Sequence, residues 1–587
     1  MTRSENNEST MRLVGDYVEI RFPYNAALIQ EIKDIPGRTF CDKGHGNKFW
    51  KIPLTDSAIA SLLLFGKQHE FQIDPNIIIA LKKKKEDEME TLAASQATDA
   101  NIEINNLGGT LRPFQKAAVA YAKRRHSCFF ADEMGLGKTV EALATIKYLN
   151  KFPAVVVCPA SLKLNWEREA RKWLPDKSIQ ILEGRKPDLR YKADIIIANY
   201  DILANHVAPL LKQARGSRPK IKAVIFDESH YMKNSQAKRT KAGEALAQGI
   251  SVNGLKLCLT GTPVVNSPHE LISQLRILDK LNEFGGWYGF AHRYCAAYKG
   301  RFGWDLSGAA HLDELNEMLC KTCYIRRRKE DVLSELPPKQ RTSIPVIIDN
   351  QKEYDEVERD VIAWLGERAA SDETFLNSLA GLPKDEQKEA IQKRAATAEQ
   401  KAERAERLVR IEMLKQVAAQ GKVNQIVPFV NEFIEQGEKV VVFANHRNIQ
   451  QELREAFPEC ASISGGDSQQ KRQDSVDRFQ KDPKCMVAVC SLKAAGVGIT
   501  LTASSNVVFT ELGWTPAEHD QAEDRCHRIG QEDSVNAWYI IGKNTIDESI
   551  AELIEEKRDV VTGATEGGNT KTQSAIDGII KSLLEKK

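Results

Sequence analysis

The sequence contains two series of short apolar runs, and each series alternates with segments long enough to form helices. The runs are rich in Val, Ile, Leu and Phe and have the length of strands. In the first half they lie at 128–130, 154–158, 194–198, 223–226 and 255–259, and in the second half at 439–443, 461–464, 486–490, 506–509 and 535–541. Because such wholly apolar strands are buried on both faces, the alternation predicts an α/β fold with a parallel sheet in each half. Two such sheets can enclose a ligand between them.

A glycine-containing loop directly follows the first apolar run. Residues 131–139 read ADEMGLGKT, and helical apolar spacing continues after them. A loop that carries Gly-Lys-Thr between a buried strand and a helix is the context of a phosphate cradle. We expect Gly135 and Gly137 to let backbone N–H groups converge on the phosphates. Lys138 would neutralise the phosphates and the Thr139 hydroxyl would ligate Mg²⁺.

This loop departs from the generic phosphate-binding pattern at one position. The pattern has a glycine five residues before Gly137, where this chain has Asp132. A glycine turn that only caps an ordinary helix is therefore the competing interpretation of the loop.

An acidic pair follows another apolar run. Residues 227–230 read DESH directly after 223–226. A buried parallel strand delivers such residues to the carboxyl edge of its sheet, where ligands bind. We expect Asp227 to hold the Mg²⁺ shell and Glu228 to orient and deprotonate an attacking water. A helix N-cap with a solvated acidic pair is the alternative, but the presence of Lys138 favours a nucleotide-hydrolysis site.

Length and charge bound the remaining classes. At 587 residues the chain has room for about three or four domains. Lys and Arg total 83 against 81 Asp and Glu, so the net charge is only +2. Any nucleic-acid contact must therefore be a local basic patch, and bulk charge neither indicates nor excludes DNA.

The 11 cysteines are scattered along the chain, which favours reduced thiols in a cytosolic setting. Cys320 and Cys323 form a CxxC pair, for which helix packing competes with a zinc or redox role, and we expect no metal except Mg²⁺. Residues 1–10 are polar. A membrane span needs about eighteen consecutive apolar residues, and no segment of the sequence has them. We expect a soluble protein of the cytoplasm or nucleoid, or of the nucleus in a eukaryote, without a signal or transmembrane segment.

The pattern outside the two apolar series predicts three further parts. Residues 1–80 have the pattern of a small α+β module with a strand at 17–22, a hairpin around 44–47 and two helices. Residues 81–106 combine a charged run with Ala, Ser and Thr, which is typical of a linker. Residues 349–421 are dense in charged residues and Ala, which predicts long protruding helices that act either as a solvated spacer or as a DNA contact. The expected domains are 1–80, 81–106 (linker), 107–285, 286–424 (helical protrusion) and 425–587.

The motifs together resemble those of superfamily-two helicases, specifically the Swi/Snf-type double-stranded DNA translocases, over roughly residues 107–560. The resemblance implies two tandem RecA-like lobes that bind ATP and Mg²⁺ between them, and Asp132 is usual within that family. Residues 111–115 (LRPFQ) resemble the adenine-reading motif, which implies that Gln115 binds the base. Residues 259–263 (LTGTP) resemble the motif that couples hydrolysis to lobe movement, which implies that role for Thr260 and Thr262.

Further motifs imply contacts from the second lobe and with DNA. Residues 521–531 (QAEDRCHRIGQ) closely resemble the arginine-finger motif, which implies that Arg525 and Arg528 reach the γ-phosphate and that Gln521 lies at the nucleotide. Such fingers are typically worth about 10³–10⁵ in rate, and a structural ion-pair network is the alternative. Residues 157–162 and 491–498 resemble the DNA-backbone motifs of the two lobes. The implied DNA contacts are Ser161, Lys163, Ser491 and Lys493, with Trp514 either near the DNA or buried.

Within this family the chain resembles the HARP-type annealing-helicase branch, through residues 302–308 (FGWDLSG) and 325–333 (IRRRKEDVL). The first module is similar to the HARP substrate-recognition module. Lys48 and its basic neighbours could grip phosphates while Trp50 stacks on an unpaired base. Because Phe49 and Trp50 alternate, we expect one of them to fill the core of the module instead.

These resemblances predict a DNA-dependent ATPase that moves along duplex DNA and re-anneals or remodels forked or junction DNA in replication and repair. DNA is the expected partner, and a single-strand-binding or replication protein is a candidate second one; the oligomeric state is not predicted. A nucleosome or protein–DNA remodeller, an RNA helicase and a catalytically inactive scaffold remain as alternatives.

Overall fold

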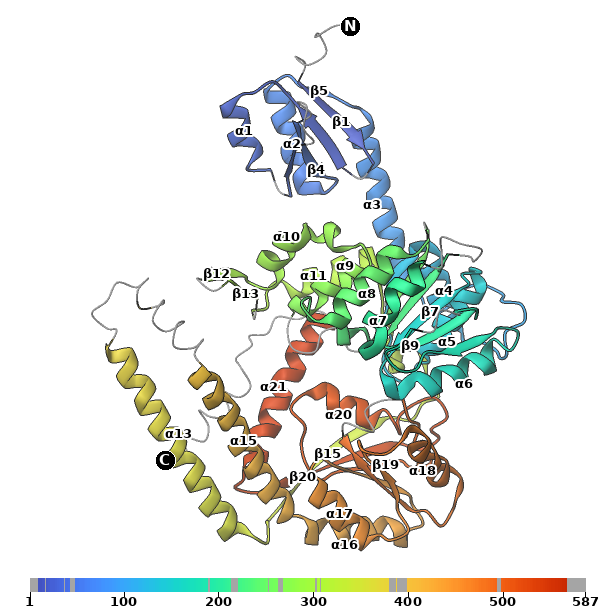
Figure 1. Ribbon diagram of the computed structural model, residues 1–587, viewed down its shortest axis with the longest axis vertical. Coiled ribbons are helices and arrows are strands. Elements are labelled where there is room, and N and C mark those ends of the chain that lie inside the picture. Colours follow the sequence, from blue (N-terminus) through green and yellow to red (C-terminus); the bar gives the residue numbers. More distant parts are fainter. Residues whose placement is uncertain are drawn as a thin grey trace.

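The computed structural model describes residues 9–15, 17–35, 37–42, 48–187, 191–212, 220–251, 253–261, 268–300, 303–306, 308–378, 387, 398–492 and 498–566. Figure 1 shows a small N-terminal module, a first α/β lobe beneath it and a second α/β lobe below that, with long helices beside the second lobe. We call the two larger parts lobe 1 and lobe 2.

The N-terminal module is a mixed sheet covered by two helices. The strand order is β3-β4-β2-β1-β5, and these pairs are antiparallel except for β1 with β5. Met11, Val18 and Ile52 are fully buried between the sheet and the helices. The elements are β1 (Thr10–Val14), β2 (Tyr17–Arg21), α1 (Ala26–Ile32), β3 (Thr39–Asp42), β4 (Lys48–Pro53), α2 (Asp56–Gln68) and β5 (Gln72–Ile73).

The segment predicted as a linker is mostly helical, so that prediction is wrong for its first half. Helix α3 (Asn76–Ser95) runs from the module into lobe 1 (Figure 1). Its Lys, Glu, Ala and Leu residues are strong helix formers, and its Lys run precedes acidic residues at i,i+4 spacing. Asp87 accepts hydrogen bonds from Arg124 and Arg125 of α4 over 2.6 and 2.7 Å. The helix is therefore docked on lobe 1.

Lobe 1 has the parallel sheet predicted for the first half. Its strand order is β14-β6-β11-β10-β7-β9-β8, with every described pairing parallel. The direction in which successive strands are added to the sheet changes at β6 and β7. In parallel sheets with such a change, the loops after the central strands meet at the carboxyl edge, where ligands bind. The strands are β6 (Ser127–Phe130), β7 (Ala154–Cys158), β8 (Ile179–Ile181), β9 (Ile195–Asn199), β10 (Ala223–Asp227), β11 (Leu255–Leu259) and β14 (Tyr324–Ile325).

Helices cover both faces of this sheet, and further elements extend lobe 1 toward the N-terminal module (Figure 1). The covering elements are α4 (Pro113–Arg125), α5 (Lys138–Tyr148), η1 (Ala160–Leu162), α6 (Lys163–Trp173), α7 (Tyr200–Lys212), η3 (Ser229–Met232) and α8 (Lys238–Gly249). The extension comprises η4 (Pro268–Glu270), α9 (Leu271–Ile277), η5 (Leu281–Phe284), α10 (Gly286–Tyr294), the hairpin β12 (Tyr298–Gly300) with β13 (Gly303–Asp305), and α11 (Leu312–Thr322).

Lobe 2 repeats the architecture with a second parallel sheet, as predicted for the second half. Its order is β15-β20-β19-β16-β18-β17. The strands are β15 (Lys339–Val346), β16 (Val440–Ala444), β17 (Ala461–Ile463), β18 (Val487–Ser491), β19 (Asn506–Phe509) and β20 (Val535–Gly542). The helices that cover them are α16 (Val423–Glu435), α17 (Arg447–Ala456), α18 (Gln469–Lys481), α20 (Pro516–Glu523) and α21 (Ile546–Glu566).

The boundaries of the two lobes differ from the predicted ones. Residues 286–424 were predicted to be a helical protrusion, but they include β14, which pairs with β6 of lobe 1, and β15, which pairs with β20 of lobe 2. Short helix α12 (Lys329–Val332) lies between them in the chain. Both strands lie at sheet edges, where one side stays unpaired and sequences need not be apolar. Neither has the buried apolar run by which the central strands were predicted.

The charged middle of the chain forms the expected long helices. Helices α13 (Gln351–Ser378) and α15 (Ala398–Gln420) project as a pair beside lobe 2 (Figure 1). The Asn350 side chain donates a hydrogen bond to the Val417 carbonyl over 3.0 Å and ties the base of this pair together. Within the described ranges, none of the helices combines the length and the apolar character that crossing a bilayer requires.

Candidate nucleotide site and nucleic-acid groove

The glycine-containing loop joins β6 to α5, as predicted, and wraps around the Lys138 side chain. The Lys138 ammonium donates hydrogen bonds to the Asp132 and Glu133 carbonyls over 2.7 and 3.3 Å. Gly135 and Gly137 adopt φ of 88° and 92°, in the left-handed region that favours glycine. Burial lowers the pKa of Lys138, although the surrounding carboxylates, Glu228 foremost, oppose that shift. The loop therefore presents a partly buried cation at the start of a helix, where anions bind.

The aspartate that replaces the pattern's glycine has a structural role. Asp132 is fully buried and accepts hydrogen bonds from the Arg327 backbone N–H over 2.9 Å and from its Nε over 3.0 Å. The Arg327 guanidinium also pairs with Glu141 and donates to the Phe114 carbonyl. Arg327 is 3% exposed. This buried network fixes the start of the phosphate-binding loop, and the sequence analysis missed Arg327 although it lies in the quoted run 325–333.

Gln115 contacts the loop itself. Its Oε1 accepts from the Arg112 backbone N–H and its Nε2 donates to the Leu136 carbonyl, both over 3.0 Å. A Cβ atom at Gly137 would lie 2.7 Å from that same amide nitrogen. Gln115 is thus held against the phosphate-binding loop, and its contact with a base stays a prediction.

The two acidic residues lie at the carboxyl end of β10, the strand that carries them to the site. Asp227 is buried, and its carboxylate accepts hydrogen bonds from the Trp166 indole N–H over 2.7 Å and from the Glu228 backbone N–H over 3.0 Å. Burial and the neighbouring charge of Glu228 raise the pKa of Asp227. Burial also raises the pKa of Glu228, while Lys138 and Arg525 oppose the shift. Glu228 has φ 50° and ψ 53°, an uncommon conformation for this residue type.

The next residues connect this strand to its neighbour. The His230 Nδ1 and the Thr260 hydroxyl oxygen are 3.3 Å apart, which joins the end of β10 to the end of β11. Burial lowers the pKa of His230 to about 4, so the ring is neutral at pH 7. Thr260 is fully buried. Thr262, the second residue expected to couple hydrolysis to movement, lies outside the described residues.

Lobe 2 delivers both predicted arginines to the site of lobe 1. Arg525 is 6% exposed, and the charge of Glu228 acts on it across the interface between the lobes. Arg528 donates to the Asp524 carbonyl and to the Thr500 hydroxyl, each over 2.9 Å. A Cβ atom at Gly135 would lie only 2.8 Å from the Arg528 Cβ, so this arginine packs on the phosphate-binding loop. Gln521 lies on α20, the helix that leads into this segment.

The donor set fits a hard divalent cation that is shared with phosphate oxygens. Asp227 is buried and the adjacent Glu228 side chain is 18% exposed, with its Oε2 atom 3.4 Å from the His230 Nδ1. Mg²⁺ favours one or two carboxylates and takes its other oxygens from water and phosphates. Among the described residues, no group of three or more His, Cys, Asp or Glu side chains is arranged to hold a metal ion. Thr139, at the second position of α5, is the hydroxyl that the loop sequence offers.

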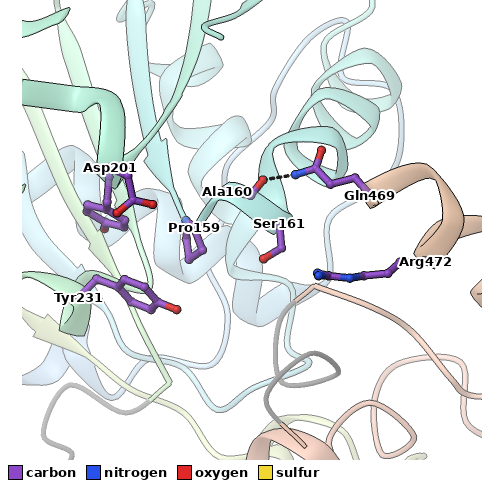
Figure 2. Close-up of a pocket in the computed structure, with 8 residues that line it drawn as sticks. Pro159, Ala160, Ser161, Asp201, Tyr231, Gln469 and Arg472 are labelled. Atoms are coloured by element: carbon purple, nitrogen blue, oxygen red, sulfur yellow. Dashed lines mark hydrogen bonds between the residues drawn. The ribbon is translucent and has the colours of Figure 1, made fainter. Parts of the chain in front are cut away.

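A cavity of about 410 Å³ between the lobes lies at the predicted DNA-backbone motif (Figure 2). Lobe 1 lines it with residues 159–161 and with the Tyr200 and Tyr231 rings, which stack with centroids 5.5 Å apart. In Figure 2 the Arg472 guanidinium points from lobe 2 toward Ser161. The Gln469 amide donates to the Ala160 carbonyl across the same gap. The cavity therefore offers a hydroxyl and a cation from opposite lobes, which is the chemistry of a backbone phosphate site.

The other residues predicted to contact DNA lie in different surroundings. Lys163 turns back and donates to the Leu182 carbonyl over 3.1 Å, whereas Ser491 ends β18. Lys493 lies outside the described residues. The Trp514 indole N–H donates to Glu412 of α15 over 2.8 Å, and the Lys415 ammonium lies 4.3 Å from the ring centroid. Trp514 thus packs against α15, one of the two long helices beside lobe 2.

Strand β4, which lies between β3 and β2 in the sheet of the N-terminal module, carries the predicted aromatic and basic residues. Phe49 is 2% exposed, whereas the partly buried Trp50 packs on the half-exposed Phe40 with ring centroids 5.0 Å apart. The Lys48 ammonium lies 3.6 Å from the Asp42 carboxylate on the neighbouring strand. Of the alternating aromatic pair, Phe49 is the less exposed, with the Arg21 guanidinium over its ring, whereas the partly buried Trp50 packs against the core of the module.

Comparisons with known proteins agree with these motifs. Residues 74–394 match the SNF2-related domain family, and residues 421–530 match the helicase conserved C-terminal domain family. The chain is 34% identical over 515 residues to the Mus musculus protein named DNA annealing helicase and endonuclease ZRANB3, which covers 84% of this chain and 44% of that protein. It therefore spans less than half the length of that relative.

A second relative is covered more fully. The Caenorhabditis elegans homolog of SWI/SNF-related matrix-associated actin-dependent regulator of chromatin subfamily A-like protein 1 is 32% identical over 573 residues, which are 93% of this chain and 74% of that protein. The solved SWI2/SNF2 ATPase core of Sulfolobus solfataricus in complex with dsDNA is 23% identical, with a TM-score of 0.36 over 79% of this chain and 96% of that one. The predicted resemblance is confirmed: the chain belongs to the SNF2-related family of helicase-type proteins.

Proposed function

We propose that this protein is a DNA-dependent ATPase that moves along duplex DNA and re-anneals or remodels forked or junction DNA. The observation that carries the proposal is the meeting of the two lobes at one site. Arg525 and Arg528 of lobe 2 lie against Glu228 and Gly135 of lobe 1, so the groups needed for phosphoryl transfer assemble only across the interface. Hydrolysis in such a site depends on how the lobes are placed, and DNA that binds both lobes controls that placement.

The residues of the site have separate roles in this mechanism. Lys138 and the backbone of the phosphate-binding loop hold the β- and γ-phosphates of ATP. Glu228 orients the attacking water and accepts its proton. Its Oε2 atom makes no hydrogen bond within the described part of the chain, although the His230 Nδ1 lies 3.4 Å away. Arg525 and Arg528 stabilise the charge that develops on the γ-phosphate. Burial lowers the pKa of Arg528 to about 9, so it stays charged at pH 7.

The Thr139 hydroxyl and the Asp227 carboxylate would hold Mg²⁺ in this site. The ion supplies neutralisation of the β- and γ-phosphate charge. Asp227 is oriented for this task by the Trp166 indole, which fixes one carboxylate oxygen, and by the Glu228 backbone N–H, which binds the other.

We propose that the DNA backbone binds in the cavity of Figure 2 between the lobes, where Ser161 and Arg472 face one another. A Cβ atom at Gly498 of lobe 2 would lie 2.0 Å from Leu162 of lobe 1, so the lobes touch closely beside this cavity. Rotation of one lobe against the other changes the distance between the two phosphate contacts. Repeated cycles would therefore advance the DNA.

The N-terminal module is proposed to recognise the junction. Lys48 and Lys51 lie on β4 beside Trp50 and the half-exposed Phe40. Cationic side chains next to a partly exposed aromatic pair suit an unpaired nucleotide, whose base can stack while its phosphate is bound. Both relatives named above resemble this chain along most of its length, and one of them is named an annealing helicase.

The decisive experiment measures ATP hydrolysis by the wild-type protein and by Glu228→Gln without nucleic acid and with single-stranded DNA, duplex DNA, forked DNA or RNA. We expect forked DNA to stimulate hydrolysis most, and Glu228→Gln to abolish it. Stimulation by RNA alone would support an RNA helicase, and nucleosome sliding without fork re-annealing would support a remodeller. Absence of hydrolysis under every condition would support a scaffold.

The junction role is tested separately with Lys48→Glu/Lys51→Glu. This variant should keep duplex-stimulated hydrolysis and lose the additional stimulation by forks. Unchanged fork affinity and unchanged fork stimulation would remove the module from the proposal.

A further inference from the structure

Lys329 lies where three parts of the chain meet. These are the phosphate-binding loop, the segment that connects the two lobes, and residues 524–528, which carry both arginines. It begins α12, shortly after the last strand of lobe 1. Its side chain is only 4% exposed. A lysine is buried to this extent only when its charge has partners.

The Lys329 ammonium lies 3.9 Å from the Glu133 carboxylate of lobe 1, but its nearest partners are Asp524 and His527 of segment 524–528. Nζ lies 2.8 Å from the Asp524 carboxylate and donates to the His527 carbonyl over 2.6 Å. Arg525 lies between these two anchor points and Arg528 directly follows the second. A single cation therefore holds both ends of the turn from which the arginines project.

The same residue is fastened to lobe 1. The Lys329 backbone N–H donates to the Glu133 carboxylate over 2.7 Å, and the Glu133 carbonyl accepts from Lys138. A Cβ atom at Gly135 would lie 3.4 Å from the Lys329 Cε and 2.8 Å from the Arg528 Cβ. Lys329 thus links the residue that holds the phosphate-binding lysine to the segment that supplies the arginines.

A second lysine shows which part of this link crosses the interface. Lys339, the first residue of β15 in lobe 2, lies 3.2 Å from Asp524 and 2.8 Å from Glu523. Burial disfavours the charged form of Asp524, but the two ammonium groups outweigh it and lower its pKa to about 2. Lys339 binds Asp524 from within lobe 2, whereas Lys329 binds it from lobe 1.

We propose that Lys329 is a positioning residue for ATP hydrolysis, which holds Arg525 and Arg528 against the phosphate-binding loop when the lobes are closed. The inference deepens the proposed function and rests on it. Lys329 acts through the arginines because its ammonium is engaged by Asp524 and His527. It sets the angle at which the arginines enter the site and, with it, the closed arrangement of the lobes.

The test compares Lys329→Met with Glu330→Gln, its neighbour, whose side chain is 67% exposed. Displacement of a catalytic group by about 1 Å costs about a hundredfold in rate. We therefore expect Lys329→Met to lower the kcat of DNA-stimulated hydrolysis by about tenfold to a hundredfold, with the KM for ATP within about twofold of wild type. Glu330→Gln should keep the wild-type values. Thermal unfolding of both variants monitors the fold, and a KM-dominated defect would overturn the inference.

A double-mutant cycle separates positioning from general damage. If Lys329 acts through the arginines, Lys329→Met should add less than about a twofold loss to Arg525→Ala, measured by single-turnover hydrolysis of labelled ATP. Full additivity of the two losses would overturn the inference. Activity that survives Glu228→Gln would instead overturn the proposed function, whereas a normal kcat in Lys329→Met alone would overturn only the role of Lys329.

Discussion

The His230 imidazole and the Thr260 hydroxyl are 3.3 Å apart and join the ends of two adjacent parallel strands. His230 follows the acidic pair by two positions, and Thr260 begins the loop toward the rest of lobe 1. The His230 Nδ1 also lies 3.4 Å from the Glu228 Oε2, so the contact with Thr260 links the residue proposed to position water to the part of the chain expected to sense lobe movement. It is made by a neutral ring, since burial lowers the pKa of His230 to about 4.

Loss of this contact should separate hydrolysis from movement. Thr260→Val removes the hydroxyl and keeps the shape of the side chain. Because coupling between sites is commonly worth about 1–3 kcal/mol, we expect the distance travelled per ATP to fall at least about fivefold while DNA-stimulated hydrolysis falls much less. Triplex-displacement and ATPase assays on one preparation measure both quantities. Equal losses in the two assays would contradict the coupling role.

The buried Arg327 network should dominate the stability of lobe 1. Arg327→Met leaves Asp132 and Glu141 buried without their cation, and removal of one partner from a buried ion pair costs about 3–5 kcal/mol. Urea denaturation followed by tryptophan fluorescence measures the loss in the free energy of unfolding. The neighbouring Arg328→Met provides the control, because that side chain is 48% exposed and its pairs are local. A change of less than about 1 kcal/mol is expected there.

The stability of lobe 2 should fall as the pH rises above neutral. Burial opposes the charge of His446, but its hydrogen bonds to Glu412 and Glu511 prevail and raise its pKa to about 9. An unfolded histidine titrates near pH 6.5. The stabilisation is thus fully present below about pH 6.5 and is lost as the pH rises through about 9, on the order of 3 kcal/mol in total.

His446→Gln isolates this contribution, since the other titrating groups are shared with the wild type. The difference between the two proteins in the free energy of unfolding should shrink between pH 6 and pH 10 in a pH series of denaturation curves. A difference that stays constant over this range would show that His446 is uncharged in the folded protein.

The phosphate contact proposed for Arg472 is testable by salt dependence. Arg472 donates to the Ser464 and Gly465 carbonyls, which aim its guanidinium into the cavity of Figure 2. Arg472→Gln should weaken duplex binding equally for all sequences and reduce the slope of log Kd against log salt by about one. Arg478→Gln on the same helix, whose side chain pairs with Glu459, should leave the slope unchanged. A sequence-dependent loss would point to base contact instead.

The central strands of both sheets could be predicted from the sequence because burial on both faces makes them continuously apolar. Strand β10, for instance, is buried along its whole length. The edge strands β14 and β15 escaped the same reasoning, whereas the edge strand β17 was predicted. Strand β15 is polar and largely exposed, and only its pairing with β20 makes it a strand. Such a pairing joins residues far apart in the chain, and composition does not contain that information.

Local composition also misled the interpretation of α3. The charged run in residues 81–106 resembles a linker, but Ile77 is buried in the core of the module and Thr91 is buried beside α4. At the site, sequence motifs supplied residues such as Lys138 and Glu228, while Arg327 and Lys329 could be recognised only from their buried partners. Motifs identify groups that chemistry demands, whereas supporting residues depend on which distant segments the fold brings into contact.

The docking of α3 fixes the distance between the N-terminal module and lobe 1. Ile77, near the start of this helix, belongs to the core of the N-terminal module, and Asp87 is salt-bridged to α4 of lobe 1, with about 15 Å of helix between the two residues. We therefore expect the module and lobe 1 to move together when lobe 2 rotates. A DNA junction bound by the module would stay at a constant distance from the phosphate contacts of lobe 1. The protein would then move duplex DNA past a recognition site that is fixed relative to lobe 1.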